Sequence, residues 1–373
     1  MTDRKTELAF VISDLGSGGA QRVLVTMANA WAQSGRGIAV VTFSAQDEDF
    51  FILDERVKRV CLNKVGVSSG VFGGLSSNIG RVTALRRTLK NMAPQNVMGF
   101  IGTTNVLVVI ASLGLGMRTL ISERNDPTRQ SFGRMWDTLR RWVYRYADVV
   151  TANSDAALEM LSAYVPKRKL ALLPNPLREP DTNSVRTRTG QTILAVGRLY
   201  PQKGYDILLE AFAQFQVRHP DWRLLVLGDG PLRIELHQQA NRLGLGDHVI
   251  WKGVVDDPFP FYQSADIFVM SSRHEGTPNA LLEAMSAATP AIVTDAIVGA
   301  LKYVENDVSG QVVPVNDPDA LAQAFARLAG DEAFRKRLGE NGKNRVSNNT
   351  LDNVLNVWEQ VLGWNMHSGR SKS

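Results

Sequence analysis

Short apolar segments alternate with segments of helical periodicity along most of the chain, and this alternation constrains the fold more than any other feature. In the first half, the apolar runs and the helical segments lie at residues 8–13, 20–33, 38–43, 57–62, 79–92, 97–101, 105–113, 119–122 and 149–152. Strands that alternate with helices predict a parallel sheet covered by helices. The first half is therefore expected to form an α/β domain.

The same alternation starts again after a short segment of different composition. Pro174-Asn175-Pro176 is followed by a polar stretch, and we interpret residues 177–190 as a linker. The second cycle lies at residues 193–196, 206–216, 224–227, 232–243, 249–251, 267–270, 279–287 and 291–293, followed by helical patterns at 318–328, 332–346 and 351–362. Because 373 residues usually exceed one core, two domains are predicted, at residues 1–176 and 191–350.

Composition and charge narrow the functional classes. No run approaches the roughly 18 apolar residues of a membrane span, and residues 1–7 are too polar for a signal peptide, so a cytoplasmic location is expected. The single cysteine, Cys61, excludes an internal disulfide. Residues 1–180 contain 23 Lys and Arg against 15 Asp and Glu, a net charge of +8, whereas residues 181–373 contain 19 against 22, a net charge of −3. The first half is thus expected to meet a membrane surface or a phosphorylated substrate, with nucleic acid the weakest candidate.

Four glycine-containing motifs follow predicted strands. In the longest, Glu275 and Glu283 are separated by seven residues that include Gly276 and Pro278, so that one helix could present both carboxylates on one face. The free N–H groups of its first turn would favour an anion. The other three motifs lie at residues 16–22, 197–204 and 228–230. Taken singly, each motif also fits an exposed helix or a tight turn.

As a set, in this order and spacing, the four motifs resemble the retaining glycosyltransferases of family 4, over roughly residues 8–364. The resemblance implies the GT-B fold, in which two doubly wound Rossmann-like domains face a central cleft. It implies an N-terminal acceptor-binding domain, a C-terminal nucleotide-sugar-binding domain, and a helix within residues 351–373 that crosses back to the first domain before a short tail. Residues 102–105 and 121–126 look like segments of bacterial enzymes that add N-acetylgalactosamine or related sugars to undecaprenyl-diphosphate-linked oligosaccharides.

The resemblance assigns the donor site mainly to the second domain. Arg198 and Lys203 are expected to neutralise the leaving diphosphate, which would make a divalent metal ion dispensable. Glu283 is expected at the ribose hydroxyls, and Glu275 is expected beside the donor sugar, where it would stabilise positive charge on the anomeric carbon. Backbone contacts with the donor are expected at Gly18, Gly19, Gly276, Thr277, Pro278 and Asn279.

The acceptor is expected to meet the first domain at Thr104, Asn105 and Arg124. Arg124 departs from the resembled pattern because many relatives carry His there, so the role of a proton-accepting imidazole does not transfer. Arg124 would instead hold an acceptor phosphate or the charge developing on the donor. The alternative is a structural salt bridge to Glu123 or Asp126.

Residues 129–146 combine aromatic and basic side chains at helical spacing. Arg134, Trp136, Arg141 and Arg145 are candidate contacts with an anionic membrane interface. The alternative is that the apolar stripe packs into its own domain. A second basic and mobile surface is expected at the Gly-rich residues 65–75 and the following residues 81–90.

These expectations predict a retaining, metal-independent hexosyltransferase that uses a nucleotide sugar, preferably linked to UDP. The acceptor would be a polyprenyl-diphosphate-linked glycan at the cytoplasmic membrane face. One alternative, a nucleotide-sugar epimerase of the same fold, would act without an acceptor. A dinucleotide-dependent oxidoreductase would need an acidic residue at the end of the second strand, and residues 43–46 supply none. A non-catalytic lipid-surface binding protein would not need the acidic and basic residues of the donor site.

Overall fold

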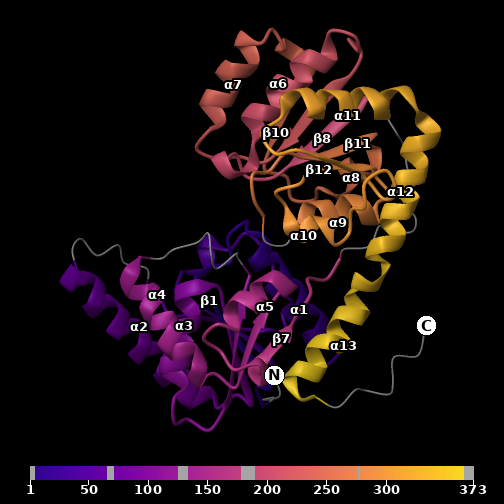
Figure 1. Ribbon diagram of the computed structural model, residues 1–373. Helices are drawn as coiled ribbons and strands as arrows, with labels where there is room; N and C mark the ends of the chain where they lie inside the picture. Colours follow the sequence, from indigo (N-terminus) through magenta and orange to yellow (C-terminus); the bar gives the residue numbers. More distant parts are fainter. Residues whose placement is uncertain (1–4, 65–70, 125–132, 178–189, 276–277, 365–373) are drawn as a thin grey trace. The chain divides into compact units, whose positions relative to one another are not determined.

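The computed structural model describes residues 5–64, 71–124, 133–177, 190–275 and 278–364. The chain divides into two compact units (Figure 1). The first unit comprises Met1–Pro176 together with Asp352–Ser373, and the second comprises Leu177–Leu351. Each unit contains one parallel sheet covered by helices, so the prediction of two doubly wound α/β domains is confirmed.

The first unit is built on a seven-stranded sheet in the order β3-β2-β1-β4-β5-β6-β7. Its strands are β1 (Leu8–Ile12), β2 (Ile38–Thr42), β3 (Lys58–Cys61), β4 (Asn96–Phe100), β5 (Arg118–Glu123), β6 (Val149–Ala152) and β7 (Leu170–Leu172). The strand order reverses between β1 and β4, which are paired in parallel. Open α/β sheets bind their ligands beyond the carboxyl ends of the strands at such a point.

Helices cover this sheet and bury its central strands. They are α1 (Gly19–Gln33), α2 (Val71–Met92), α3 (Gly102–Ser112), α4 (Arg134–Val143), α5 (Asp155–Leu161) and α13 (Leu351–Leu362). Every residue of β1 and β2 is buried, because a parallel sheet with helices on both faces exposes neither side of its central strands. This explains why these strands are continuous apolar runs in the sequence.

The second unit repeats the arrangement with a six-stranded sheet in the order β10-β9-β8-β11-β12-β13. Its strands are β8 (Thr192–Val196), β9 (Arg223–Leu227), β10 (Val249–Gly253), β11 (Ile267–Met270), β12 (Ala291–Thr294) and β13 (Gln311–Val313). Its helices are α6 (Tyr205–Gln216), α7 (Arg233–Arg242), α8 (Phe259–Ser264), α9 (Asn279–Ser286), α10 (Val298–Leu301), α11 (Pro318–Gly330) and α12 (Glu332–Val346). The strand order reverses between β8 and β11, and this places the switch point of the second sheet beside the loops that follow these strands.

The last helix of the chain, α13, packs in the first unit. The indole nitrogen of Trp31 in α1 donates to Glu359 at 3.0 Å, and the indole nitrogen of Trp358 donates to the carbonyl of Pro174 at 3.1 Å. The Trp358 ring also contacts Phe10 and Phe100. Because α13 completes this aromatic core, the first unit requires the C-terminal segment of the chain.

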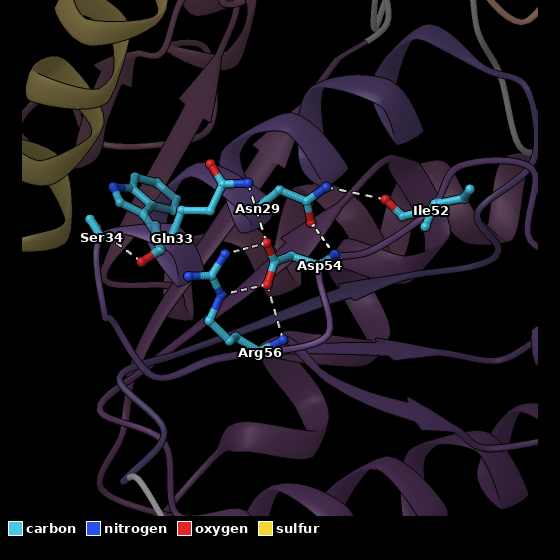
Figure 2. Close-up of polar contacts among 7 residues, drawn as sticks. Asn29, Gln33, Ser34, Ile52, Asp54 and Arg56 are labelled. Atoms are coloured by element: carbon cyan, nitrogen blue, oxygen red, sulfur yellow. Dashed lines mark hydrogen bonds and ion pairs between the residues drawn. The ribbon is translucent and has the colours of Figure 1, made fainter.

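A polar cluster fixes the segment that leads into the edge strand β3 (Figure 2). The side chain of Asn29 in α1 donates to the carbonyl of Ile52 and accepts from the backbone N–H of Asp54. The Asp54 carboxylate accepts from the guanidinium and the backbone N–H of Arg56, and these bonds hold its pKa well below the usual range. The cluster is a local structural feature at the edge of the first sheet.

The observed helices and strands differ from the predicted ones in several places. Helix α2 begins at Val71 rather than near residue 79, so the Gly-rich stretch expected to be mobile is helical from Val71 onward. Among the described α-helices and strands, five short ones were not predicted: α5, α8, α10, β7 and β13. They have three to seven residues each, too few for a hydrophobic period to be recognised. Within the described residues, no helix combines the length and apolarity needed to cross a bilayer.

Candidate active site

Three loops at the carboxyl ends of β8, β9 and β11 interlock through glycines. Gly204 has a left-handed φ of +65°, and a Cβ atom there would lie 2.2 Å from the carbonyl oxygen of Ser271. At Gly228, with φ of +133°, a Cβ would lie 2.0 Å from the carbonyl oxygen of Gly197. Neither position tolerates a side chain without moving a neighbouring backbone. The glycines therefore let the three loops lie against one another at the edge of the sheet.

The interlocked loops bring Lys203 and Glu275 together. Lys203 ends the short 3₁₀ segment Pro201–Lys203 after β8, and its ammonium group forms an ion pair with Glu275 Oε1. The hydroxyl of Ser272 donates to the same oxygen at 2.8 Å. The two charged side chains are only 17% and 10% exposed. Two residues predicted from separate motifs thus form one compact charged pair, and Ser272 is a partner that the sequence motifs did not indicate.

Arg273 ties the loop that carries Glu275 to the loop that carries Lys203. Its guanidinium bonds both carboxylate oxygens of Asp206, at 3.0 and 2.6 Å, and the carbonyl of Pro201 at 2.6 Å. Its backbone N–H donates to the backbone carbonyl of Gln202 at 2.7 Å. Burial of Asp206 opposes ionisation, but the hydrogen bonds and charge of Arg273 outweigh it and lower the pKa of Asp206. Arg273 therefore fixes the spacing of the two loops.

Arg198 lies on the same loop as Lys203 but points to the surface. Its guanidinium lies 5.0 Å from the ring centre of Tyr200, and both side chains are exposed. In the part of the chain that the structure describes, the Arg198 guanidinium makes no hydrogen bond or ion pair. Its charge is therefore available to an anion, whereas that of Lys203 is neutralised by Glu275.

The expectation that Glu275 and Glu283 share one helical face is wrong. Helix α9 begins at Asn279, preceded by Pro278 with a non-helical ψ of 75°, so that Glu275 lies in the loop before the helix. Pro278 is buried, and Asn279 opens the helix. Glu283 is inside the helix and only 6% exposed. Gly276 and Thr277 lie outside the described residues.

In the first unit, the glycine loop after β1 leads directly into α1. Gly18 is the N-cap residue and Gly19 the first helical residue, and the helix has neither a side-chain cap nor an acidic residue in its first turn. The Asp14 carboxylate accepts from the backbone N–H of Gly16 and from the Gln21 side chain, both at 3.0 Å. Burial alone would raise the pKa of Asp14, but these bonds and that of Ser13 lower it. An uncapped helix N-terminus of this kind suits an anion.

Arg124 is part of the interior of the first unit. Its guanidinium donates to Ser122 at 2.8 Å, to the carbonyl of Leu173 at 3.1 Å and to the Asn175 side chain at 2.6 Å. It also stacks on two rings, 5.1 Å from the centre of Phe100 and 4.8 Å from that of Trp358. Burial lowers its pKa to about 9.

The alternative of a salt bridge from Arg124 to Glu123 is wrong, since no such pair forms among the described residues; Asp126 lies outside them. Arg124 holds the segment that leaves the first unit, and α13, in place.

Thr104 and Asn105 are also buried, on the first turn of α3. The Asn105 amide donates to the carbonyl of Ser122, to Glu123 and to the hydroxyl of Tyr144. Burial raises the pKa of Glu123 and, with the neighbouring Glu123 charge, that of Tyr144, and the two side chains are hydrogen-bonded to each other. This buried network was not predicted, because its members come from three separate elements.

The aromatic side chains exposed at α4 and just after it differ from the one predicted to contact a membrane. Trp136 is partly buried and packs against two core clusters, whereas Trp142 and Tyr146 are 59% and 61% exposed. Arg141 and Arg145 are exposed, and the Arg145 guanidinium lies 4.5 Å from the centre of the Trp142 ring. The side chain of Arg134 lies outside the described part of the molecule. The alternative of core packing thus holds for Trp136, while a basic and aromatic surface remains beside it.

Two stretches have the Asp-x-Asp spacing that can hold a metal ion, residues 47–49 and 317–319. Both have structural roles: Asp49 forms an ion pair with Arg59 at 2.8 Å, and Asp317 caps α11. Among the described residues, no group of three or more His, Cys, Asp or Glu side chains is arranged to hold a metal ion. Metal independence stays a prediction.

Two Rossmann-like domains, with a Lys–Glu pair at the switch point of the second, define a glycosyltransferase of the GT-B class. Residues 18–176 match the Glycosyl transferase 4-like domain, and residues 179–345 match Glycosyl transferases group 1. The chain is 31% identical over 250 residues to the lipopolysaccharide core biosynthesis glycosyltransferase LpsE of Rhizobium meliloti, covering 65% of this chain and 69% of that protein. The chain belongs to the family 4 glycosyltransferases.

Two further similarities extend over nearly the whole chain. One is to GalNAc-alpha-(1->4)-GalNAc-alpha-(1->3)-diNAcBac-PP-undecaprenol alpha-1,4-N-acetyl-D-galactosaminyltransferase of Campylobacter jejuni, 27% identical over 95% of this chain and 98% of the relative. The other is to the crystal structure of Anabaena Alr3699/HepE in complex with UDP and glucose. That structure has a TM-score of 0.75 and 20% identity, over 96% of this chain and 98% of that one. The structural similarity confirms the fold.

Proposed function

We propose that the enzyme is a retaining, metal-independent transferase that moves a hexose or N-acetylhexosamine from a UDP-sugar to a polyprenyl-diphosphate-linked glycan. The reaction would take place at the cytoplasmic face of the membrane. The observation that carries the proposal is the Lys203–Glu275 pair on interlocked, Gly-bounded loops, because it joins the cation and the carboxylate that sugar transfer from a nucleotide requires.

The donor is proposed to bind with its diphosphate toward Arg198 and Lys203. A planar guanidinium and a mobile ammonium group together neutralise a leaving diphosphate, which is why no divalent ion is required. Gly18 and Gly19, at the uncapped start of α1, are proposed as further backbone contacts with the donor. UDP is proposed as the nucleotide because the similar Anabaena structure is described in complex with UDP and glucose.

The two glutamates are proposed to have separate roles. Glu283, in α9, would accept hydrogen bonds from the ribose hydroxyls, with Pro278, Asn279 and the neighbouring backbone facing the phosphate and the sugar. Glu275 would orient the donor sugar and stabilise positive charge at the anomeric carbon. In a front-face reaction the acceptor hydroxyl attacks the anomeric carbon as its bond to the diphosphate breaks, and the leaving phosphate oxygen takes the hydroxyl proton.

A lipid-linked acceptor is proposed because the similar Campylobacter enzyme is named for an undecaprenol-linked substrate. The exposed surface at the end of α4 and on the following 3₁₀ segment Tyr144–Tyr146 fits this acceptor class: Trp142 and Tyr146 supply apolar area, and Arg141 and Arg145 supply positive charge. Amphipathic surfaces of this composition bind at the interface of anionic membranes. The first half of the chain, with its net charge of +8, would favour the same surface.

A screen of nucleotide sugars with and without lipid-linked acceptors tests the proposal. The expected result is transfer from a UDP-sugar that depends on the acceptor, with the α configuration of the donor kept in the product. Turnover of the donor without an acceptor would indicate an epimerase. Binding without any turnover would indicate a non-catalytic protein, and either outcome would refute the proposed function.

A further inference from the structure

The Glu275 carboxylate receives both of its recorded bonds on a single oxygen. Lys203 and Ser272 both contact Oε1, and in the described part of the chain no group bonds Oε2. One carboxylate oxygen is therefore fixed by the protein, while the other has capacity to accept hydrogen bonds from a ligand.

The two contacts on Oε1 differ in what happens to them when a donor binds. Under the proposed function, the diphosphate of the donor competes for Lys203, because it carries more negative charge than a carboxylate. Once Lys203 turns to the diphosphate, Ser272 is the one described donor left on Glu275. The Glu275 side chain is only 10% exposed, and a carboxylate in such a place is costly without a hydrogen-bond partner.

Ser272 is well placed to keep this bond because the contacts that fix its position do not involve the Lys203 ammonium group. It is 1% exposed and lies two residues after the end of β11, and its carbonyl accepts from the hydroxyl of Thr294 at the end of β12. The next residue, Arg273, is fixed by Asp206. The hydroxyl of Ser272 therefore projects from a rigid part of the sheet edge.

We propose that Ser272 is a positioning residue that keeps Glu275 directed at the donor sugar while Lys203 is bound to the diphosphate. The inference rests on the proposed function and assigns Ser272 no contact with the donor. It predicts that Ser272 affects the rate of transfer through Glu275 and leaves the affinity for the nucleotide unchanged.

The first test compares Ser272→Ala with a matched variant, Ser309→Ala. Ser309 is also 1% exposed and hydrogen-bonded, but it precedes β13 and so lies at the opposite end of the sheet. Ser272→Ala should lower kcat on the order of 10-fold, as expected for the loss of a hydrogen bond to a charged group, with KM for the donor and Kd for UDP unchanged. Ser309→Ala should leave all three unchanged.

The second test is a double-mutant cycle with Glu275→Ala. If Ser272 acts through Glu275, Ser272→Ala should cause no further loss of kcat once Glu275 is replaced. Additive losses, or a Ser272→Ala variant that behaves like Ser309→Ala, would overturn the inference while leaving an active transferase and the proposed function intact. A wild-type enzyme with no transfer activity would instead refute the proposed function, and the role of Ser272 with it.

Discussion

The polar side chains at the carboxyl ends of the strands have different surroundings in the two units. In the second unit, polar and charged side chains after β8 and β11 meet on interlocked loops, and Lys203 and Glu275 keep some exposure. In the first unit, the polar side chains at the end of β5 turn inward: Glu123 bonds Tyr144, and Arg124 lies between aromatic rings. The same fold thus has a candidate ligand site at the strand ends of one unit and a buried network at those of the other.

The difference teaches that a charged residue after a parallel strand does not by itself mark a ligand site. In the second unit, glycines such as Gly204 and Gly228 let the loops pack directly on one another, and this packing brings the charged pair together at the edge of the sheet. In the first unit, Arg124 and Asn105 are covered by neighbouring elements and already have several partners. Arg124 Nη2 and Asn105 Oδ1 nevertheless have no hydrogen-bond partner among the described residues, and acceptor contacts at these two residues stay a prediction.

The largest effect is expected from the charged pair of the second unit. Lys203→Ala should lower turnover on the order of 100-fold or more, because it removes a cation from the leaving diphosphate. Arg198→Ala should have a comparable effect, although its side chain is exposed. The matched control is Arg327→Ala, which removes a cation from an exposed ion pair with Asp307. Steady-state kinetics would contradict this account if Lys203→Ala and Arg327→Ala were equally active.

The two glutamates should differ in which kinetic constant they change. Glu275→Ala should chiefly lower kcat, by about 10- to 100-fold, because the carboxylate is proposed to act at the reacting sugar. Glu283→Ala should chiefly raise KM for the donor, because that carboxylate is proposed to bind the ribose. Initial rates over a range of donor concentrations measure both constants. If both variants altered only the dependence on acceptor, the two residues would belong to another site.

In the first unit, replacement of Arg124 should affect stability more than donor binding. Arg124→Ala removes three hydrogen bonds and the packing between Phe100 and Trp358, and should lower the free energy of unfolding by about 3 kcal/mol. Arg124→Met keeps much of the packing without a buried charge and should cost less. Urea denaturation measures the difference. Equal stability of wild type and Arg124→Ala would show that the buried network does not hold α13.

A smaller effect is expected from the basic residues of α4 and of the 3₁₀ segment that follows it. Changing Arg134, Arg141 and Arg145 to Glu should weaken binding to anionic liposomes and slow transfer to lipid-linked acceptors, since each basic residue contributes about 1 kcal/mol at an anionic surface. Transfer to a short soluble acceptor should be nearly unchanged. Arg218 and Lys336, exposed in the second unit, provide a charge-reversal control. Sedimentation with liposomes at low and high salt would contradict the account if the α4 variant bound as well as wild type.

No effect is expected from a metal chelator. Activity should survive excess EDTA, because Arg198 and Lys203 are proposed to replace a divalent ion at the diphosphate. The assay needs only the wild-type enzyme, with and without chelator. Complete loss of activity that magnesium or manganese restores would refute metal independence.

The sequence predicted the parts of the molecule whose local pattern is strong. The central strands are continuous apolar runs, and α12 and α13 begin and end where their periodicity predicts. The Lys203 and Glu275 motifs were also recognised, but not their contact, because a motif does not specify which oxygen meets which ammonium group. The prediction that Glu275 and Glu283 share a helical face failed because the backbone at Pro278 is not helical and α9 begins only at Asn279.

Other features depend on packing between distant segments. Trp136 shares an apolar stripe at helical spacing with Leu139 and Val143, but the sequence left open whether this stripe packs into its own domain or faces a membrane, and only the tertiary fold decides it. The burial of Arg124 likewise depends on Trp358, far away in the sequence. Ser272 was missed because a serine after a strand is common, and only the bond to Glu275 gives it significance.

The central claim is that nucleotide recognition resides in the charged loops of the second unit. Calorimetric titration of UDP into wild type, Lys203→Ala and Arg124→Met tests it most directly. The account predicts that wild type and Arg124→Met bind UDP equally, whereas Lys203→Ala binds at least about 10-fold more weakly, as expected when a charge-assisted hydrogen bond to phosphate is lost. Unchanged binding by Lys203→Ala, or loss of binding in a folded Arg124→Met variant, would contradict it.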